Sequence, residues 1–115
     1  MSERAKEIAT KAGVSKTHFE IYDDRIARSL RAAEECRFSD VLHMYNYVEY
    51  RYGRIMDEAR EGMKAGKINL DELGELAMGM LTFQVVKLSD RLNDITAEKC
   101  GCRWTLPPRR RTRVE

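Results

Sequence analysis

The sequence predicts an all-α fold: a short N-terminal helix, then three long antiparallel helices in an up-down-up bundle, then a basic disordered C-terminal tail. Three observations lead to this prediction. Both prolines, Pro107 and Pro108, stand near the end of the chain, so residues 1–106 can form helices without interruption by proline. Apolar residues recur at steps of three or four. A content of 43% hydrophobic and 35% charged residues is typical of a compact soluble chain. The 115 residues are enough for one helical domain at 1–100 with an arginine-rich tail at 101–115.

The first three predicted helices follow from their caps and apolar stripes. Gly13 can end the short leading helix, and Ser15 can cap a first long helix that runs to about Cys36. Its apolar stripe contains Phe19, Tyr22, Ile26, Leu30 and Ala33. Ser39 can cap a second long helix that ends near Met63, because residues 65–68 interrupt the pattern. The stripe of this second helix contains Val41, Tyr45, Val48, Tyr52, Ile55, Ala59 and Met63.

A third long helix is expected from Asn69, its cap, to about Lys99. The connections at 37–38 and 65–68 are short, so neighbouring helices should run antiparallel. Between residues 76 and 88 this helix is apolar on more than one face, which predicts that another chain covers it and that the protein is a homodimer. Gly74 and Gly79 either permit close helix packing or bend this segment.

The predicted tail is strongly basic. Residues 101–115 hold five arginines and one glutamate, whereas residues 1–100 hold slightly more acidic than basic side chains. Four of the arginines, Arg109, Arg110, Arg111 and Arg113, lie almost side by side in the sequence. Such a run can contact phosphates or an acidic protein surface, and it can equally serve as a solubilising tail.

Residues 7–22 carry a recognisable pattern. A small residue, Ala9, is followed by Gly13 at a turn and by the apolar Val14 directly after it. This pattern resembles the helix-turn-helix of DNA-binding regulators, in which the small residue lies where two helices touch and the glycine takes the left-handed turn. Ile8, Phe19 and Tyr22 match the other inward positions. The resemblance implies major-groove contacts by Ser15, Lys16, Thr17, His18 and Glu20. A short amphipathic helix, capped at Gly13 and followed by a serine cap, explains the same residues without DNA.

The up-down-up order brings the three cysteines and one histidine to one pole of the bundle. These candidate metal ligands are Cys36, His43, Cys100 and Cys102. Three thiols and an imidazole suit a closed, structural zinc site with no open position for catalysis. A redox disulfide and ordinary cysteines, with no cofactor, are the alternatives. In each case the topology predicts that Cys36 lies within disulfide reach of Cys100 or Cys102.

Tyrosines occur on both faces of the second long helix. Tyr45 and Tyr52 follow the buried stripe, whereas Tyr47 and Tyr50 are expected to point outward. Aromatic rings with polar tips are effective anchors in protein interfaces.

The sequence also leads us to expect that several functional classes do not apply. The sequence has no nucleophile elbow, phosphate-binding glycine loop or pair of catalytic carboxylates, so we expect a protein that is not an enzyme. No apolar run approaches the roughly 20 residues of a membrane span, and no apolar signal follows the N-terminus, so a cytoplasmic location is expected.

The leading hypothesis is therefore a small nucleic-acid-binding regulator or accessory factor that uses residues 15–20 and the arginine tail. The alternative is a helical adaptor or inhibitor that docks on a partner protein through the second and third long helices.

Overall fold

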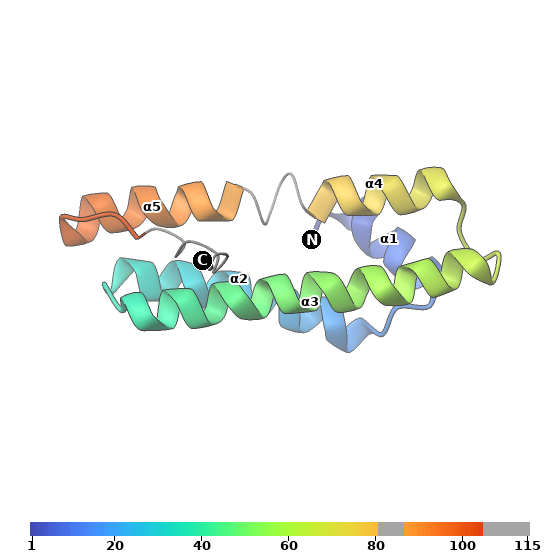
Figure 1. Cartoon of the computed structure of the whole chain (residues 1–115), viewed down its shortest axis with the longest axis horizontal. Coiled ribbons are helices and arrows are strands. Elements are labelled where there is room, and N and C mark those ends of the chain that lie inside the picture. The colour runs from blue at the N-terminus through green and yellow to red at the C-terminus, as the bar shows by residue number, and fades with distance from the viewer. Residues whose placement is uncertain (81–86, 105–115) are drawn as a thin grey trace, which may run out of the picture.

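The computed structural model describes residues 1–80 and 87–104, and these residues are helical apart from short connections and the segment after residue 100 (Figure 1). The helices are α1 (Glu3–Ala12), α2 (Lys16–Glu34), α3 (Phe38–Lys64), α4 (Leu70–Met80) and α5 (Lys87–Cys100). The all-α prediction is confirmed. The predicted third long helix is described in two parts, α4 and α5, and its continuity lies outside the described residues.

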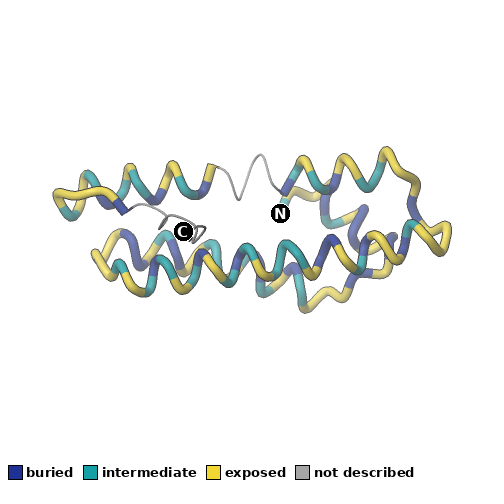
Figure 2. The backbone as a smooth tube through the Cα atoms, in the orientation of Figure 1, coloured by how far each residue is buried: buried dark blue, intermediate teal, exposed yellow. Residues whose placement is uncertain are grey.

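Helix α3 is the longest element, and the other helices are arranged along it (Figure 1). Helix α2 runs antiparallel to α3 as its main neighbour. Helices α1 and α4 contact one another and the second half of α3, whereas α5 packs on α2 near the other end of the molecule. Buried residues line the sides of the helices that face one another (Figure 2). Within the described residues no helix is long and apolar enough to cross a membrane.

Two of the predicted helix caps, Gly13 and Asn69, are present in the structure. At the end of α1, Gly13 adopts a left-handed conformation with φ 92°, and its N–H and that of Val14 bond the Thr10 and Ala9 carbonyls. At the start of α4, the Asn69 side chain accepts the Glu72 N–H at 2.8 Å, and the Glu72 carboxylate accepts the Asn69 N–H at 3.0 Å. Helix α3 begins one residue before the expected cap at Ser39.

The core contains most of the apolar stripes named above. Tyr22, Val48 and Ile55 are fully buried between α2 and α3, and Leu76 and Leu92 are the buried anchors of α4 and α5. The Tyr22 hydroxyl donates to the Met80 carbonyl at 3.4 Å, which links α2 to the end of α4. Burial raises the pKa of Tyr22, so this phenol stays protonated and available as a donor.

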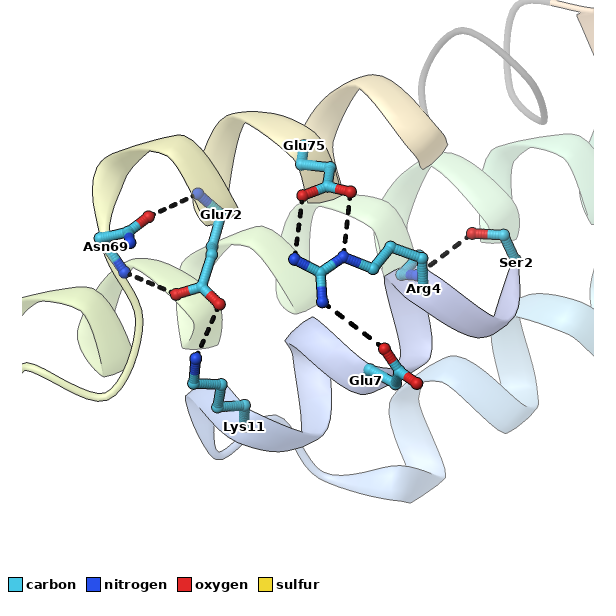
Figure 3. A network of polar contacts seen from close by, with 8 residues as sticks. Ser2, Arg4, Glu7, Lys11, Asn69, Glu72 and Glu75 are labelled. Carbon is cyan, nitrogen blue, oxygen red and sulfur yellow. Dashed lines mark hydrogen bonds and ion pairs between the residues drawn. The ribbon is translucent and has the colours of Figure 1, made fainter.

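Ion pairs join α1 to α4 on the surface (Figure 3). The Arg4 guanidinium donates to both carboxylate oxygens of Glu75, at 3.0 and 3.2 Å. Lys11 donates to Glu72 at 2.7 Å. These groups are mostly exposed, so each pair contributes little stability, but together they fix the direction in which α1 lies against α4.

The packed part of the chain extends beyond the predicted domain boundary at residue 100. Trp104 is only 4% exposed, and its ring centroid lies 5.4 Å from that of Tyr45. Its backbone N–H donates to Thr96 Oγ1 at 2.8 Å. The residues that connect α5 to Trp104 therefore form a strap across the end of the bundle. The predicted tail began at residue 101, and Trp104 within it is packed; the rest of that tail, residues 105–115, lies outside the described residues.

Helices α1 and α3 approach so closely that only glycine fits between them. A Cβ atom on Gly62 would lie 2.8 Å from the carbonyl carbon of Ala12 and 2.9 Å from its Cα. These are backbone atoms and cannot rotate aside, so a side chain at this position must push α1 away from α3.

We therefore expect Gly62→Ala to lower the free energy of unfolding by about 1–3 kcal/mol, because the added methyl overpacks a backbone contact. Gly53 is the matched control, since it stands in the same helix and its Cβ would meet nothing within 4 Å. Gly53→Ala should leave stability unchanged or raise it by up to about 1 kcal/mol through helix propensity. Urea unfolding of both variants measures the difference, and equal effects would contradict the close-packing account.

Candidate functional site

The N-terminal segment has a glycine turn and a buried apolar side, and these features do not separate the two interpretations of its sequence. Ile8, Ala9, Val14, Phe19 and Tyr22 are buried, and the glycine turn between α1 and α2 is present. A DNA-reading motif and a capped amphipathic helix share these features. The outward residues are therefore the ones that bear on function.

Those outward residues are partly engaged within the chain. Ser15, Lys16, Thr17 and Glu20 are exposed, and Lys16 lies 3.8 Å from Glu20. His18 is different, because both of its ring nitrogens contact α3.

His18 lies between a carboxylate and a guanidinium. Its Nε2 is 2.8 Å from Glu58 Oε2, and its Nδ1 is 2.8 Å from Arg51 Nη1. Arginine can only donate, so Nδ1 accepts from Arg51 and Nε2–H donates to Glu58. His18 thus fixes the position of the Arg51 guanidinium.

Glu58 also caps the N-terminus of α2. Its Oε1 accepts the backbone N–H of Ser15 at 3.0 Å, whereas the Ser15 side chain makes no capping bond. The Ser15 N–H, followed by His18 and the Arg54 charge, holds the pKa of the Glu58 carboxyl below its usual range. A carboxyl whose folded pKa is lowered stabilises the fold above its unfolded pKa, and this stability disappears as the pH falls through the folded value.

We expect Glu58→Gln to reduce the loss of stability between pH 7 and about pH 3, because the variant has no carboxylate to protonate at this position. Thermal unfolding across this pH range measures the effect. Glu61→Gln is the control, since Glu61 is exposed and, within the described ranges, its carboxylate pairs with Lys64, a neighbour on the same helix. It should retain the wild-type pH dependence. If Glu58→Gln loses as much stability in acid as the wild type, Glu58 does not have this role.

A hollow of about 420 Å³ opens on the middle of α3. It is lined by His43, Asn46, Tyr47, Tyr50 and Arg51. These positions are three or four residues apart, so they share one face of the helix. Tyr47 makes edge contacts with His43 and with Tyr50, at 5.9 and 6.5 Å between ring centroids. Tyr50 is 58% exposed, as the sequence predicted for an outward tyrosine.

An arginine guanidinium group lies over each of the two tyrosine rings that line the hollow. Arg25 reaches from α2 to lie 5.0 Å from the centroid of Tyr47, and Arg51 lies 5.5 Å from that of Tyr50. A cation above an aromatic face is attracted by the ring quadrupole, whose face is partially negative. The Nε atoms of Arg25 and Arg51 are buried, and within the described part of the chain they have no hydrogen-bond partner.

A second, smaller hollow of about 150 Å³ continues along the seam between α2 and α3. Arg28, Arg31, Arg37, Asp40 and Met44 line it together with Ala32. Asp40 pairs with Arg37, which also contacts Glu35 at 2.8 Å. Arg28 pairs with Asp24 at 3.0 Å, so Arg31 is the lining arginine for which the described residues show no ion pair.

The two hollows form one surface, because Arg25 and Arg28 are one turn apart on α2 while Met44 and Tyr47 are one turn apart on α3. We call this surface the arginine–tyrosine face. It consists of Arg25, Arg28, Arg31, Arg37, His43, Asn46, Tyr47, Tyr50 and Arg51.

Cys36 and Cys100 meet at one pole, as predicted, and are joined by a disulfide with 5.7 Å between their Cα atoms. The four-ligand zinc site is not formed, because two of its sulfurs are bonded to each other and His43 contacts Tyr47 instead. Within the described residues no group of three or more histidine, cysteine or acidic side chains could hold a metal ion. Cys102 is free and exposed.

Sequence reasoning identified Tyr47 and Tyr50 but missed Arg25, Arg51 and Glu58 as members of a site. The spacing of His43, Tyr47 and Arg51 along one face was a usable signal for part of it. The tail arginines Arg109, Arg110, Arg111 and Arg113 lie outside the described residues. No family model matches the chain, and no curated protein or solved structure matches it either.

Proposed function

We propose that this chain is a small, non-enzymatic nucleic-acid-binding protein, a regulator or accessory factor, that holds a single strand on the arginine–tyrosine face. The observation that carries the proposal is the hollow on α3, in which two tyrosine rings adjoin a row of guanidinium groups. Proteins that bind single strands combine a basic track for the phosphates with aromatic rings on which bases stack.

The contacts within the chain favour the arginine–tyrosine face over the start of α2 as the binding surface. At the start of α2, the Ser15 N–H and both His18 nitrogens are already bonded, and Lys16 is near Glu20. On the arginine–tyrosine face, Arg25 and Arg28 share Asp24, and Arg37 pairs with Glu35 and Asp40. Arg31, however, has no ion pair within the described residues, and no acidic residue lines the larger hollow. The face is therefore better suited to receive phosphates, while residues 15–20 can act only at its margin.

The arginine tail fits the same proposal as a second, sequence-independent contact. A run of arginines adds phosphate contacts and makes binding more sensitive to salt.

The proposal predicts that a labelled single strand of about 15 nucleotides binds the protein more tightly than a duplex of the same length. Tyr50→Ala should weaken single-strand binding roughly five- to hundredfold, since stacking of one base contributes about 1–3 kcal/mol. Tyr50→Phe keeps the ring and should bind almost as the wild type does. Fluorescence anisotropy over a range of salt concentrations measures all three proteins.

Removal of one positive charge at a time distinguishes binding at the arginine–tyrosine face from non-specific attraction to the whole protein. Arg31→Ala should weaken binding and reduce the salt slope by about 0.7. Arg60→Ala changes the net charge equally, but Arg60 lies nine residues after Arg51, on the opposite side of α3, so it should have little effect. Equal effects of both variants, or no binding by the wild type at low salt, would contradict the proposal and favour the protein-docking alternative.

We also propose that the protein is a homodimer. Two exposed apolar side chains on α4, Leu70 at 71% and Met78 at 58%, lie eight residues apart on the same helical face and support this. A dimer through α4 leaves the arginine–tyrosine face free, whereas a dimer through that face would bring like charges together.

Light scattering should therefore give about twice the 13.4 kDa mass of one chain, with Leu70→Gln shifting the protein toward the single-chain mass. The single-chain mass at all concentrations would contradict the dimer.

A further inference from the structure

All three cysteines belong to the pole where α2 and α5 end. Two of them form the Cys36–Cys100 disulfide, and the third, Cys102, has a free thiol. Cys102 is two residues after Cys100, so its Cα lies within about 7 Å of the Cys100 Cα. A thiol this close to a disulfide is a potential nucleophile toward it.

The exposure of the three cysteines favours a reaction between them. Cys36 and Cys102 are both exposed, whereas Cys100 is partly buried. Cys36 is thus the more exposed residue of the disulfide. Cys100 Sγ lies 3.6 Å from the Ala33 carbonyl oxygen, which can accept a hydrogen bond from a thiol formed at that sulfur.

The backbone at Cys36 forms the C-terminal cap of α2, in which the Cys36 and Arg37 N–H groups donate to the Ala33 and Ala32 carbonyls at 3.1 and 2.9 Å. Cys36 has a φ of 61°, a left-handed conformation that non-glycine residues rarely adopt and that no other non-glycine residue takes within the described ranges. Gly101, between the other two cysteines, has a φ of 77°, and nothing packs within 4 Å of the position its Cβ would take. The segment that carries Cys102 therefore has room to move toward Cys36.

We propose that Cys102 is the internal nucleophile of a thiol–disulfide exchange centre. The Cys102 thiolate attacks Cys36 Sγ, a Cys36–Cys102 bond forms, and the Cys36–Cys100 bond breaks. Cys100 leaves as a thiolate and takes up a proton. One disulfide and one thiol are present before and after, so the step needs no external oxidant or reductant.

The exchange moves the attachment of α2 from the end of α5 to the strap that leads to Trp104. Because Trp104 is packed against Tyr45 and Thr96, a crosslink two residues closer to it changes its surroundings. Trp104 is the single tryptophan of the chain, so its fluorescence reports the exchange. The strap also precedes the arginine tail, so the exchange would alter where the tail leaves the body.

The test uses the full chain in oxygen-free buffer with a metal chelator, incubated at several pH values. Free thiols are then alkylated, the protein is digested with trypsin, and tandem mass spectrometry locates the label within the fragment of residues 100–103. We expect label on Cys100, together with a Cys36–Cys102 link. Its rate of appearance should rise about tenfold per pH unit below the range where thiols ionise, because the thiolate is the attacking species.

Two variants complete the experiment. Cys102→Ser should retain only the Cys36–Cys100 disulfide and show no change in Trp104 emission with time. Cys100→Ser, mildly oxidised, should form the Cys36–Cys102 link and reproduce the emission of the exchanged wild type. Label confined to Cys102 at every pH, label on Cys36, or failure of Cys100→Ser to form the link would each overturn the proposal.

Discussion

The close contact between Gly62 and Ala12 is the constraint on which the rest of the structure depends. It sets α1 against the second half of α3 at backbone distance, and so determines where the turn after α1 delivers the start of α2. Glu58, one turn before Gly62 on α3, then meets the Ser15 N–H and His18. His18 in turn holds Arg51 beside the tyrosine hollow. The close packing at Gly62, near one end of α3, is thereby connected to the side-chain positions at the tyrosine hollow.

Ion pairing differs between the α1–α4 contact and the seam of α2 and α3. Between α1 and α4, acidic and basic groups are matched in pairs such as Arg4 with Glu75 and Lys11 with Glu72 (Figure 3). Along the seam of α2 and α3, Arg25 and Arg28 share one carboxylate, that of Asp24, and Arg31 has no ion pair within the described residues, while Arg25 also lies over an aromatic ring. Matched pairs orient elements at little net charge, whereas unmatched arginines create a positive potential that attracts anions. The near-neutral net charge of the whole chain hides this difference.

Much of the fold could be predicted because its signals are local. The apolar period marked α2 and α3, Gly13 marked the turn, and Asn69 marked the start of α4. The directions of these helices then correctly placed Cys36 near Cys100. The candidate site was harder to predict from the sequence, because its contacts join residues that are far apart along the chain. His18 contacts Glu58 across 40 positions, and Arg25 contacts a tyrosine on another helix. Trp104 was assigned to the tail because the prolines and arginines after it dominate the composition there, yet one aromatic side chain suffices to anchor a strap.

The central claim is that the arginine–tyrosine face, and not the start of α2, receives the single strand. The most direct measurement is an NMR titration of isotope-labelled protein with a short oligothymidine, following backbone amide and arginine side-chain signals. The account predicts that the largest changes occur at Arg25, Arg31, Tyr47, Tyr50 and Arg51, with α4 unaffected. Changes concentrated at residues 15–20, or spread evenly over all basic residues, would contradict it.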